Sequence, residues 1–372
     1  MGVLTTARAL LADLLTVLCI AVFATTPAVA QIPAGYPTSY TDVIAAAKKE
    51  GQLRIYSSLD EASAKPLLDD FAKMYPGIEV EFSNLNSNHL YNRVLSEAAA
   101  KQPSADFVWT GGSDQAVSLA ADGYVAEYAS PEGPSLPQWA VWKNMVYGIT
   151  AEPYVFLYNK RALQGSLVPQ SHAQLLQLVK EEPDVFRDKV ILLDPTRTTG
   201  LMMNIYDAVN MPNFFVLIRA LAGNGMTLQT SNAAMIEKVS SGEAVLAWNV
   251  DGAYVAQQLT RNPSIGQVMP SDYTLVRSRA AFITKAAANP NTAKLMLDYL
   301  VSKRGQKLMA DASKIYAARE DIEAETSSAM LRAKLGPALR PLPINEELIE
   351  RVMNDEKRLD FLRKFQDAMR RN

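Results

Sequence analysis

The stretch ADFVWTGGSDQ, residues 105–115, carries the pattern that decides the fold. Asp106 leads into an apolar run that breaks at Thr-Gly-Gly, and Ser113-Asp114 then begins a helical pattern. An apolar run bounded by glycines and followed by a helix start predicts a buried strand joined to a helix by a tight turn. Strand ends of this kind leave backbone amides facing a cleft, so the stretch also predicts a place for a ligand.

Runs rich in β-branched and aromatic residues recur along the chain, separated by helical patterns such as residues 64–75 and 90–101. This alternation of strand and helix predicts an α/β architecture with mostly parallel sheets. The predicted strands are Leu53–Ser58, Ile78–Phe82, Asp106–Thr110, Tyr154–Asn159, Val190–Asp194, Ala244–Asn249 and the long run Tyr273–Thr284.

The C-terminal part, from about Asn291 on, has a helical pattern almost throughout. Residues 292–311 are expected to form a helix with an apolar face. Residues 344–372 read as a charged amphipathic helix, for which packing on the protein body is a better explanation than a membrane or nucleic-acid role. We therefore expect a helical C-terminal part.

The N-terminal segment, residues 1–30, has an early basic residue, an apolar stretch and Ala28-Val29-Ala30 before Gln31. This order predicts a secretory signal peptide that is cleaved, and hence a protein of the periplasm. A retained membrane anchor is one alternative, and a lipid anchor through Cys19 is another. No later segment has the roughly 18 consecutive apolar residues of a membrane-spanning helix.

The composition restricts the function classes. The net charge is −2 and no block of like charges occurs, whereas a nucleic-acid partner normally needs a basic face. Cys19 is the only cysteine and lies in the predicted signal, so neither a cysteine nucleophile nor a thiolate metal site is expected. We expect no cofactor and no resident metal.

Four predicted strand ends share small hydroxyl residues, glycines or amides, and one of them opens a helix with Thr-Thr-Gly. A helix start of that kind can hold a carboxylate or phosphate with its amides and hydroxyls. The alternatives are that the hydroxyl residues only cap helices and that the two tryptophans belong to the core. The predicted ligand-binding residues are Ser57, Ser58, Asp60, Trp109, Thr110, Gly111, Gly112, Arg197, Thr198, Thr199, Gly200, Trp248 and Asn249.

Catalytic motifs do not appear in the sequence. There is no G-x-S-x-G elbow, no H-E-x-x-H and no nucleotide-binding glycine loop. His89 and His172 are the only histidines, and both fall in helical patterns away from the predicted strand ends. A binding protein is therefore expected rather than an enzyme, and an exported α/β hydrolase is the alternative from another class.

Six motifs follow one another in the chain: RIYSSLDE (54–61), ADFVWTGGSDQ (105–115), YGITAEPYVFLYNKRAL (147–163), PTRTTG (195–200), SGEAVLAWN (241–249) and TAKLMLDYLVSKRGQKLMA (292–310). Their order resembles that of periplasmic solute-binding proteins of ABC importers, in the iron(III)-type cluster of extracellular solute-binding protein family 1. The resemblance implies the two-lobed type II fold, with lobe 1 at 31–148 plus 275–372 and lobe 2 at 149–274. It also implies a hinged monomer that delivers a small solute to a membrane permease. A solute sensor that docks to a receptor is a further alternative.

The resemblance allows a test for iron. Iron-binding members typically supply a histidine after the first strand, a glutamate after the second motif and a tyrosine pair. The corresponding positions here hold Asp60, Gly111 and Gly252-Ala253, with Tyr254 adjacent. We therefore expect an organic anion or a phosphate-bearing solute, with Arg197 as its partner, and keep ferric iron as the alternative. Asp60 also leaves a zwitterion or polyamine open.

Overall fold

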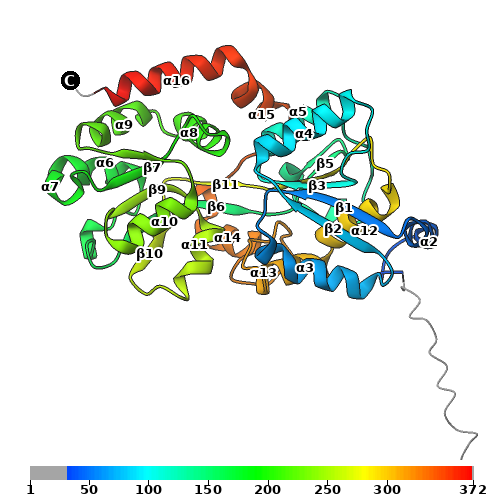
Figure 1. Cartoon of the computed structure of the whole chain (residues 1–372). Coiled ribbons are helices and arrows are strands. Elements are labelled where there is room, and N and C mark those ends of the chain that lie inside the picture. The colour runs from blue at the N-terminus through cyan, green and yellow to red at the C-terminus, as the bar shows by residue number, and fades with distance from the viewer. Residues whose placement is uncertain (1–31, 371–372) are drawn as a thin grey trace, which may run out of the picture. The chain divides into compact units, whose positions relative to one another are not determined.

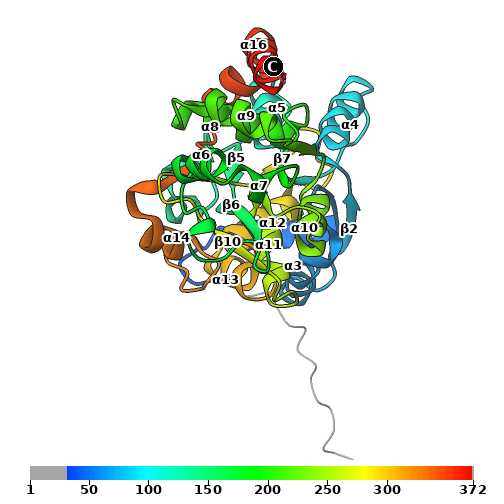
Figure 2. The same ribbon diagram turned by 90° about the vertical axis from the view of Figure 1, so that its left-hand side faces the viewer.

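The computed structural model describes residues 32–370, so the predicted signal peptide and its cysteine lie outside the described residues. Tyr36–Asn372 form one compact unit, and the following description concerns that unit. Two β-sheets with helices packed around them make up its core (Figures 1 and 2). The chain therefore has the α/β, two-lobed architecture that the sequence predicts, with a helical C-terminal part.

The first sheet has six strands in the order β2-β1-β3-β12-β5-β4. Its central strand β3 is buried along its whole length, as the apolar run in residues 105–115 predicts. The strands are β1 (Gln52–Ser57), β2 (Glu79–Asn84), β3 (Phe107–Thr110), β4 (Val141–Trp142), β5 (Val146–Gly148) and β12 (Ala280–Ile283).

The second sheet has seven strands. Six follow the order β13-β11-β6-β9-β7-β8, and β10 pairs with β6 beside that path. Its inner strands β7 and β9 are buried on both faces, which explains why they read as continuous apolar runs rather than as alternating ones. The strands are β6 (Glu152–Asn159), β7 (Val190–Leu193), β8 (Thr227–Gln229), β9 (Leu246–Asp251), β10 (Ile265–Val268), β11 (Thr274–Arg277) and β13 (Leu339–Pro341).

Helices cover both sheets (Figure 1). In chain order they are α2 (Tyr40–Glu50), α3 (Glu61–Met74), α4 (Ser87–Ala99), α5 (Ser113–Ala121), α6 (His172–Glu181), α7 (Pro183–Phe186), α8 (Thr198–Asn210), α9 (Phe214–Gly223), α10 (Asn232–Ser241), α11 (Gly252–Leu259), α12 (Pro290–Val301), α13 (Lys303–Asp311), α14 (Ser328–Leu335), α15 (Glu346–Leu348) and α16 (Asp355–Met369). Within residues 32–370, none of them has the length and apolar character needed to cross a bilayer.

Three expectations from the sequence need correction. The sheets are mixed rather than mostly parallel, because β12 and β6 run antiparallel to the strands beside them. The run Tyr273–Thr284 is two strands in different sheets, β11 and β12. Residues 292–311 form two helices, because Ser302 leaves the helical conformation and caps α13 by accepting a hydrogen bond from the Gly305 amide at 3.1 Å.

The C-terminal helix α16 packs against α9, as Figure 2 shows at the top of the view. Phe361 and Phe365 lie in a cluster of aromatic rings with Phe214 of α9, at centroid distances of 6.0 and 6.3 Å. The prediction that the charged tail packs on the protein body is therefore correct.

The chain passes from the first sheet to the second between Gly148 and Glu152, and it returns between Arg277 and Ala280. After that return, β13 pairs with β11, and α16 packs on α9 beside the second sheet. These late elements fall within the segment 275–372, which the sequence assigns to lobe 1. The lobe bounds stay a prediction.

Candidate functional site

Residues that follow strands of both sheets line one cavity of about 1150 Å³. On the first sheet's side lie the ends of β1 and β3 and the start of α4. On the second sheet's side lie the starts of α8, α10 and α11. Arg277 and Arg279, from the segment that joins the two sheets, complete the lining. Binding at the carboxyl ends of strands is the common arrangement in open α/β sheets.

Seven of the predicted ligand-binding residues line this cavity: Ser58, Asp60, Gly111, Arg197, Thr198, Thr199 and Gly200. The other six do not line it: Ser57, Trp109, Thr110, Gly112, Trp248 and Asn249. The Ser57 hydroxyl donates to the Trp109 carbonyl at 2.8 Å, and the Asn249 amide donates to the Asp207 carboxylate. Thr110 is buried at the end of β3, and Gly112 is buried in the turn that precedes α5. These residues therefore support the strand ends through internal hydrogen bonds and packing, and do not face the cavity.

The two tryptophans belong to the core. Trp109 is fully buried and Trp248 is 1% exposed. The Trp248 ring packs against His172 and Phe214 at centroid distances of 5.4 and 5.9 Å. The alternative interpretation, that both are core aromatics, is therefore correct, and the cavity is instead lined by Tyr254 of α11 and by His89 of α4.

Replacing Trp248 with alanine is expected to lower the free energy of unfolding by about 3–5 kcal/mol, because it empties the space between two rings. Solute affinity at a temperature where the variant is folded is expected to stay within about threefold of the wild type, since the ring does not line the cavity. Urea unfolding and calorimetric titration measure the two quantities separately. A large loss of affinity in a stably folded variant would contradict this placement.

Five helices begin at the cavity, and four of them are capped by their own N-cap side chains. Asp60 accepts from the Ser63 amide in α3, Asn86 from His89 in α4, Ser231 from Ala234 in α10 and Asp251 from Ala253 in α11. The fifth is α8, whose N-cap residue Arg197 caps no amide. An uncapped helix start offers free N–H groups and the positive end of the helix dipole. The start of α8 is thus the part of the wall best suited to an anion.

The local sequence fixes how α8 begins. A Cβ at Gly200 would lie 2.0 Å from the Asp194 carbonyl oxygen, so glycine is needed for the turn to approach β7 this closely. The Thr198 hydroxyl donates to the Asn88 side chain of α4 at 2.8 Å. Arg197 is exposed and makes no ion pair with any residue between 32 and 370. The start of α8, the hydroxyls of Thr198 and Thr199 and the guanidinium of Arg197 therefore lie on one side of the cavity.

Two buried arginines form the other cationic feature, and sequence reasoning missed both. Arg277 donates to Glu152 at 2.6 Å, to Asp251 at 2.9 Å and to the Gly111 carbonyl at 2.9 Å. Arg279 donates to Glu152 at 2.7 Å and to the Tyr254 hydroxyl at 3.2 Å. Among the described residues, Nη1 of Arg279 finds no hydrogen-bond acceptor, although the side chain lines the cavity.

The carboxylates of this network titrate differently. Burial acts to raise the pKa of Glu152, but Arg279 and Arg277 outweigh it and bring the pKa down to about 2. Burial, together with the charge of Glu152, raises the pKa of Asp251 to about 7, in spite of Arg277. The arginines therefore hold Glu152 ionised, whereas Asp251 is the carboxylate of this network that takes up a proton more easily.

Of the positions where the resemblance places iron ligands, Asp60 and Gly111 line this cavity, whereas Gly252 and Ala253 do not and only the adjacent Tyr254 does. Asp60 is committed to capping α3, and Gly111 has no side chain. Across residues 32–370, no three His, Cys, Asp or Glu side chains come together in a way that could hold a metal ion. This donor set is poor in the hard anionic oxygens that ferric iron prefers.

Comparison with known proteins identifies the family. Residues 66–334 match the model of the bacterial extracellular solute-binding proteins, and the chain belongs to this family. A comparison with curated protein sequences gives no match.

Solved structures agree with this assignment. The substrate-binding protein of an ABC transporter from Agrobacterium tumefaciens is 30% identical, with a TM-score of 0.80, covering 86% of this chain and 94% of that one. AfuA from Actinobacillus pleuropneumoniae, solved with fructose-6-phosphate bound, is 18% identical with a TM-score of 0.68, covering 86% and 98%. Iron-bound HitA from Pseudomonas aeruginosa is 19% identical with a TM-score of 0.65, covering 85% and 99%. The last two show likeness of fold.

Proposed function

We propose that this protein is the substrate-binding component of an ABC importer and that it captures a small organic anion, a carboxylate or phosphate compound, between its two lobes. The lobes would be 31–148 with 275–372, and 149–274. The protein would act as a monomer in the periplasm, after export through residues 1–30, and deliver its solute unchanged to a permease. The Agrobacterium relative, a substrate-binding protein of an ABC transporter, supports the transport part of the proposal.

The start of α8 is the observation that carries the choice of an anion. It is the one uncapped helix start among the five at the cavity, and Thr198, Thr199 and the unpaired Arg197 stand at it. Backbone amides at a helix start and a guanidinium fork both match the oxygens of carboxylate and phosphate groups. Ser58 and the free Nη1 of Arg279 would bind other oxygens of the same solute.

A thermal-shift screen of the protein without residues 1–30 tests the proposal. The panel contains sugar phosphates, organic acids, ferric citrate, amino acids and polyamines. A ligand that binds only the folded state raises the melting temperature, and mass spectrometry of the mixture then checks that the ligand is recovered unchanged. We expect stabilisation by a carboxylate or phosphate compound. Stabilisation by iron alone, by a polyamine alone or with turnover of the ligand would contradict the proposal.

The affinity for a carboxylate ligand is expected to rise as the pH falls from 8 to 6. Asp251 has its pKa near 7, so in this interval it takes up a proton and the wall of the cavity loses a negative charge. By linkage, anion binding raises that pKa further and draws a proton from solution. Calorimetry in buffers of different ionisation enthalpy measures the uptake. Asp251→Asn is expected to abolish the pH dependence, and a dependence that persists in this variant would assign it to another group.

A further inference from the structure

A second hollow lies at the opposite end of the first sheet from the solute cavity. The residues after β3, at its carboxyl end, face the solute cavity, whereas Ser104, just before β3, lines the second hollow. Thr284 and Lys285 follow β12, which runs antiparallel to β3, so they arrive at the same far end. We call this hollow, of about 400 Å³, the distal pocket.

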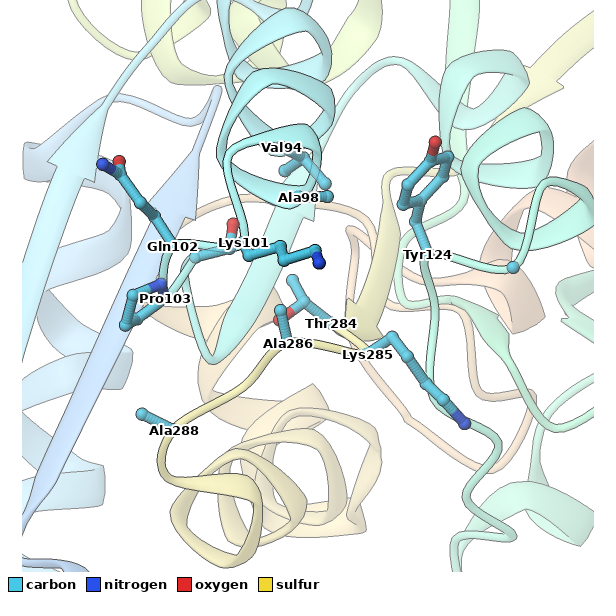
Figure 3. Close-up of a pocket in the computed structure, with 12 residues that line it drawn as sticks. Val94, Ala98, Lys101, Gln102, Pro103, Tyr124, Thr284, Lys285, Ala286 and Ala288 are labelled. Atoms are coloured by element: carbon cyan, nitrogen blue, oxygen red, sulfur yellow. The ribbon is translucent and has the colours of Figure 1, made fainter.

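The distal pocket combines apolar walls with amines. Val94 and Ala98 of α4 form one wall, and Thr284 and Ala286 lie below it (Figure 3). The only charged side chains in the lining are Lys101 and Lys285, and no carboxylate takes part. In Figure 3 the Lys101 side chain extends between Ala98 and Thr284 toward Tyr124, while Lys285 lies at the rim and points away.

Lys101 stands where a glycine would normally be. It follows the end of α4 with a φ of 53°, a left-handed conformation that costs a non-glycine residue about 1 kcal/mol. Its ammonium makes no ion pair or hydrogen bond with any residue from 32 to 370. The nearest acidic side chain in sequence, Glu97, is already engaged by Arg93, Tyr56 and Ser104. The pocket therefore presents an uncompensated positive charge beside an apolar surface.

We propose that the distal pocket binds a small organic anion with a flat apolar body, such as an arylcarboxylate, as a second site separate from the solute cavity. The body lies between α4 and Ala286, and the carboxylate meets the Lys101 ammonium. The volume falls within the roughly 300–1,000 Å³ of pockets that hold small molecules, and is too small for a folded partner. Lys285 swings in from the rim as a second cation.

Calorimetric titration with phenylacetate tests this site, in the Thr199→Asp background so that the solute cavity does not contribute. Phenylacetate is expected to bind. Lys101→Glu is expected to weaken the binding at least about tenfold, because it reverses the charge at the anchor. Phenylacetamide has the same shape without the charge, and should bind about tenfold more weakly. Lys285→Glu should have a smaller effect than Lys101→Glu.

Two controls make the result specific. Lys101→Arg keeps the charge and should stay within about threefold of the parent. Lys314→Glu makes the same charge change at another exposed lysine with a left-handed φ, of 54°, outside the pocket, and should leave the affinity unchanged. Absence of phenylacetate binding at millimolar concentration, or equal loss in the Lys101→Glu and Lys314→Glu variants, would overturn the proposal. Neither outcome would bear on the proposed solute site, because Lys101 and Lys314 do not line the solute cavity.

Discussion

Replacing Glu152 with alanine is expected to lower the free energy of unfolding by about 3–5 kcal/mol, the range measured when one partner of a buried ion pair is removed. Glu152 is fully buried at the start of β6 and accepts hydrogen bonds from Arg277 and Arg279 at 2.6 and 2.7 Å. Without it, Asp251 is the only carboxylate of the network that remains to balance two buried guanidinium groups, and burial raises its pKa.

The pH dependence of this loss has a definite sign. Because the folded state holds the pKa of Glu152 at about 2, below its ordinary value of 4.5, its contribution is complete above about pH 5 and fades as the pH falls toward 2. Denaturant unfolding of the variant and the wild type at pH 7 and pH 3 measures the change. We expect the difference in stability to be larger at pH 7.

Glu81→Ala is the matched control, because Glu81 pairs with Arg54 at 3.1 Å on the surface, where its side chain is half exposed. Such a pair contributes about 0–1 kcal/mol. If the two variants lost equal stability, the buried network would not hold the connection between the sheets in the way described.

Thr199→Asp is expected to weaken binding of the anionic solute by about 100-fold or more. The substitution sets a carboxylate in the first turn of α8, where it competes for the free amides and repels the anion. The acidic residue also suits a helix start, so the variant is expected to fold at least as well as the wild type. Affinity is measured by calorimetry and folding by the melting temperature.

Two further variants separate charge from shape at this position. Thr199→Asn has nearly the size of aspartate without its charge, and should lose far less affinity. Thr227→Asp makes the same charge change at an exposed threonine at the start of β8 that does not line the cavity, and should leave the affinity unchanged. An unchanged affinity in Thr199→Asp itself would mean that the solute does not meet the start of α8.

The sequence predicts local structure well where apolar runs are short and clearly bounded. The predicted strand Leu53–Ser58 is shifted by one residue at each end relative to β1, and Val190–Asp194 is one residue longer than β7. It fails at Tyr273–Thr284, where Arg277-Ser278-Arg279 separates two apolar runs, because the sequence does not tell a polar break within one strand from a passage between two sheets. The antiparallel direction of β12 could not be predicted either, because strand direction depends on the strands with which it pairs in space.

The residues of the candidate site could likewise be predicted only in part from the sequence. Thr199 and Gly200 could be predicted as site residues because the start of a helix has a recognisable sequence pattern. Arg277 and Arg279 could not, since with Ser278 they read only as a polar break between apolar runs. Their partners Glu152 and Asp251 come from distant parts of the chain and are seen only in the folded structure. The prediction that Trp109 and Trp248 bind the ligand is wrong, because a large ring beside a polar turn has the same sequence pattern whether it faces a cavity or the core.

The position of β12 has a consequence for how the chain assembles. Ala281 of this strand lies beside Trp109 of β3, although the whole of β6 to β11 separates them in sequence. During synthesis, β3 cannot acquire its neighbour until residues 280–283 have been made, so contacts this far apart favour a slow, late closure of the first sheet. A chain that ends before residue 280 therefore lacks the strand that pairs with this edge of β3, and the edge stays open to other strands.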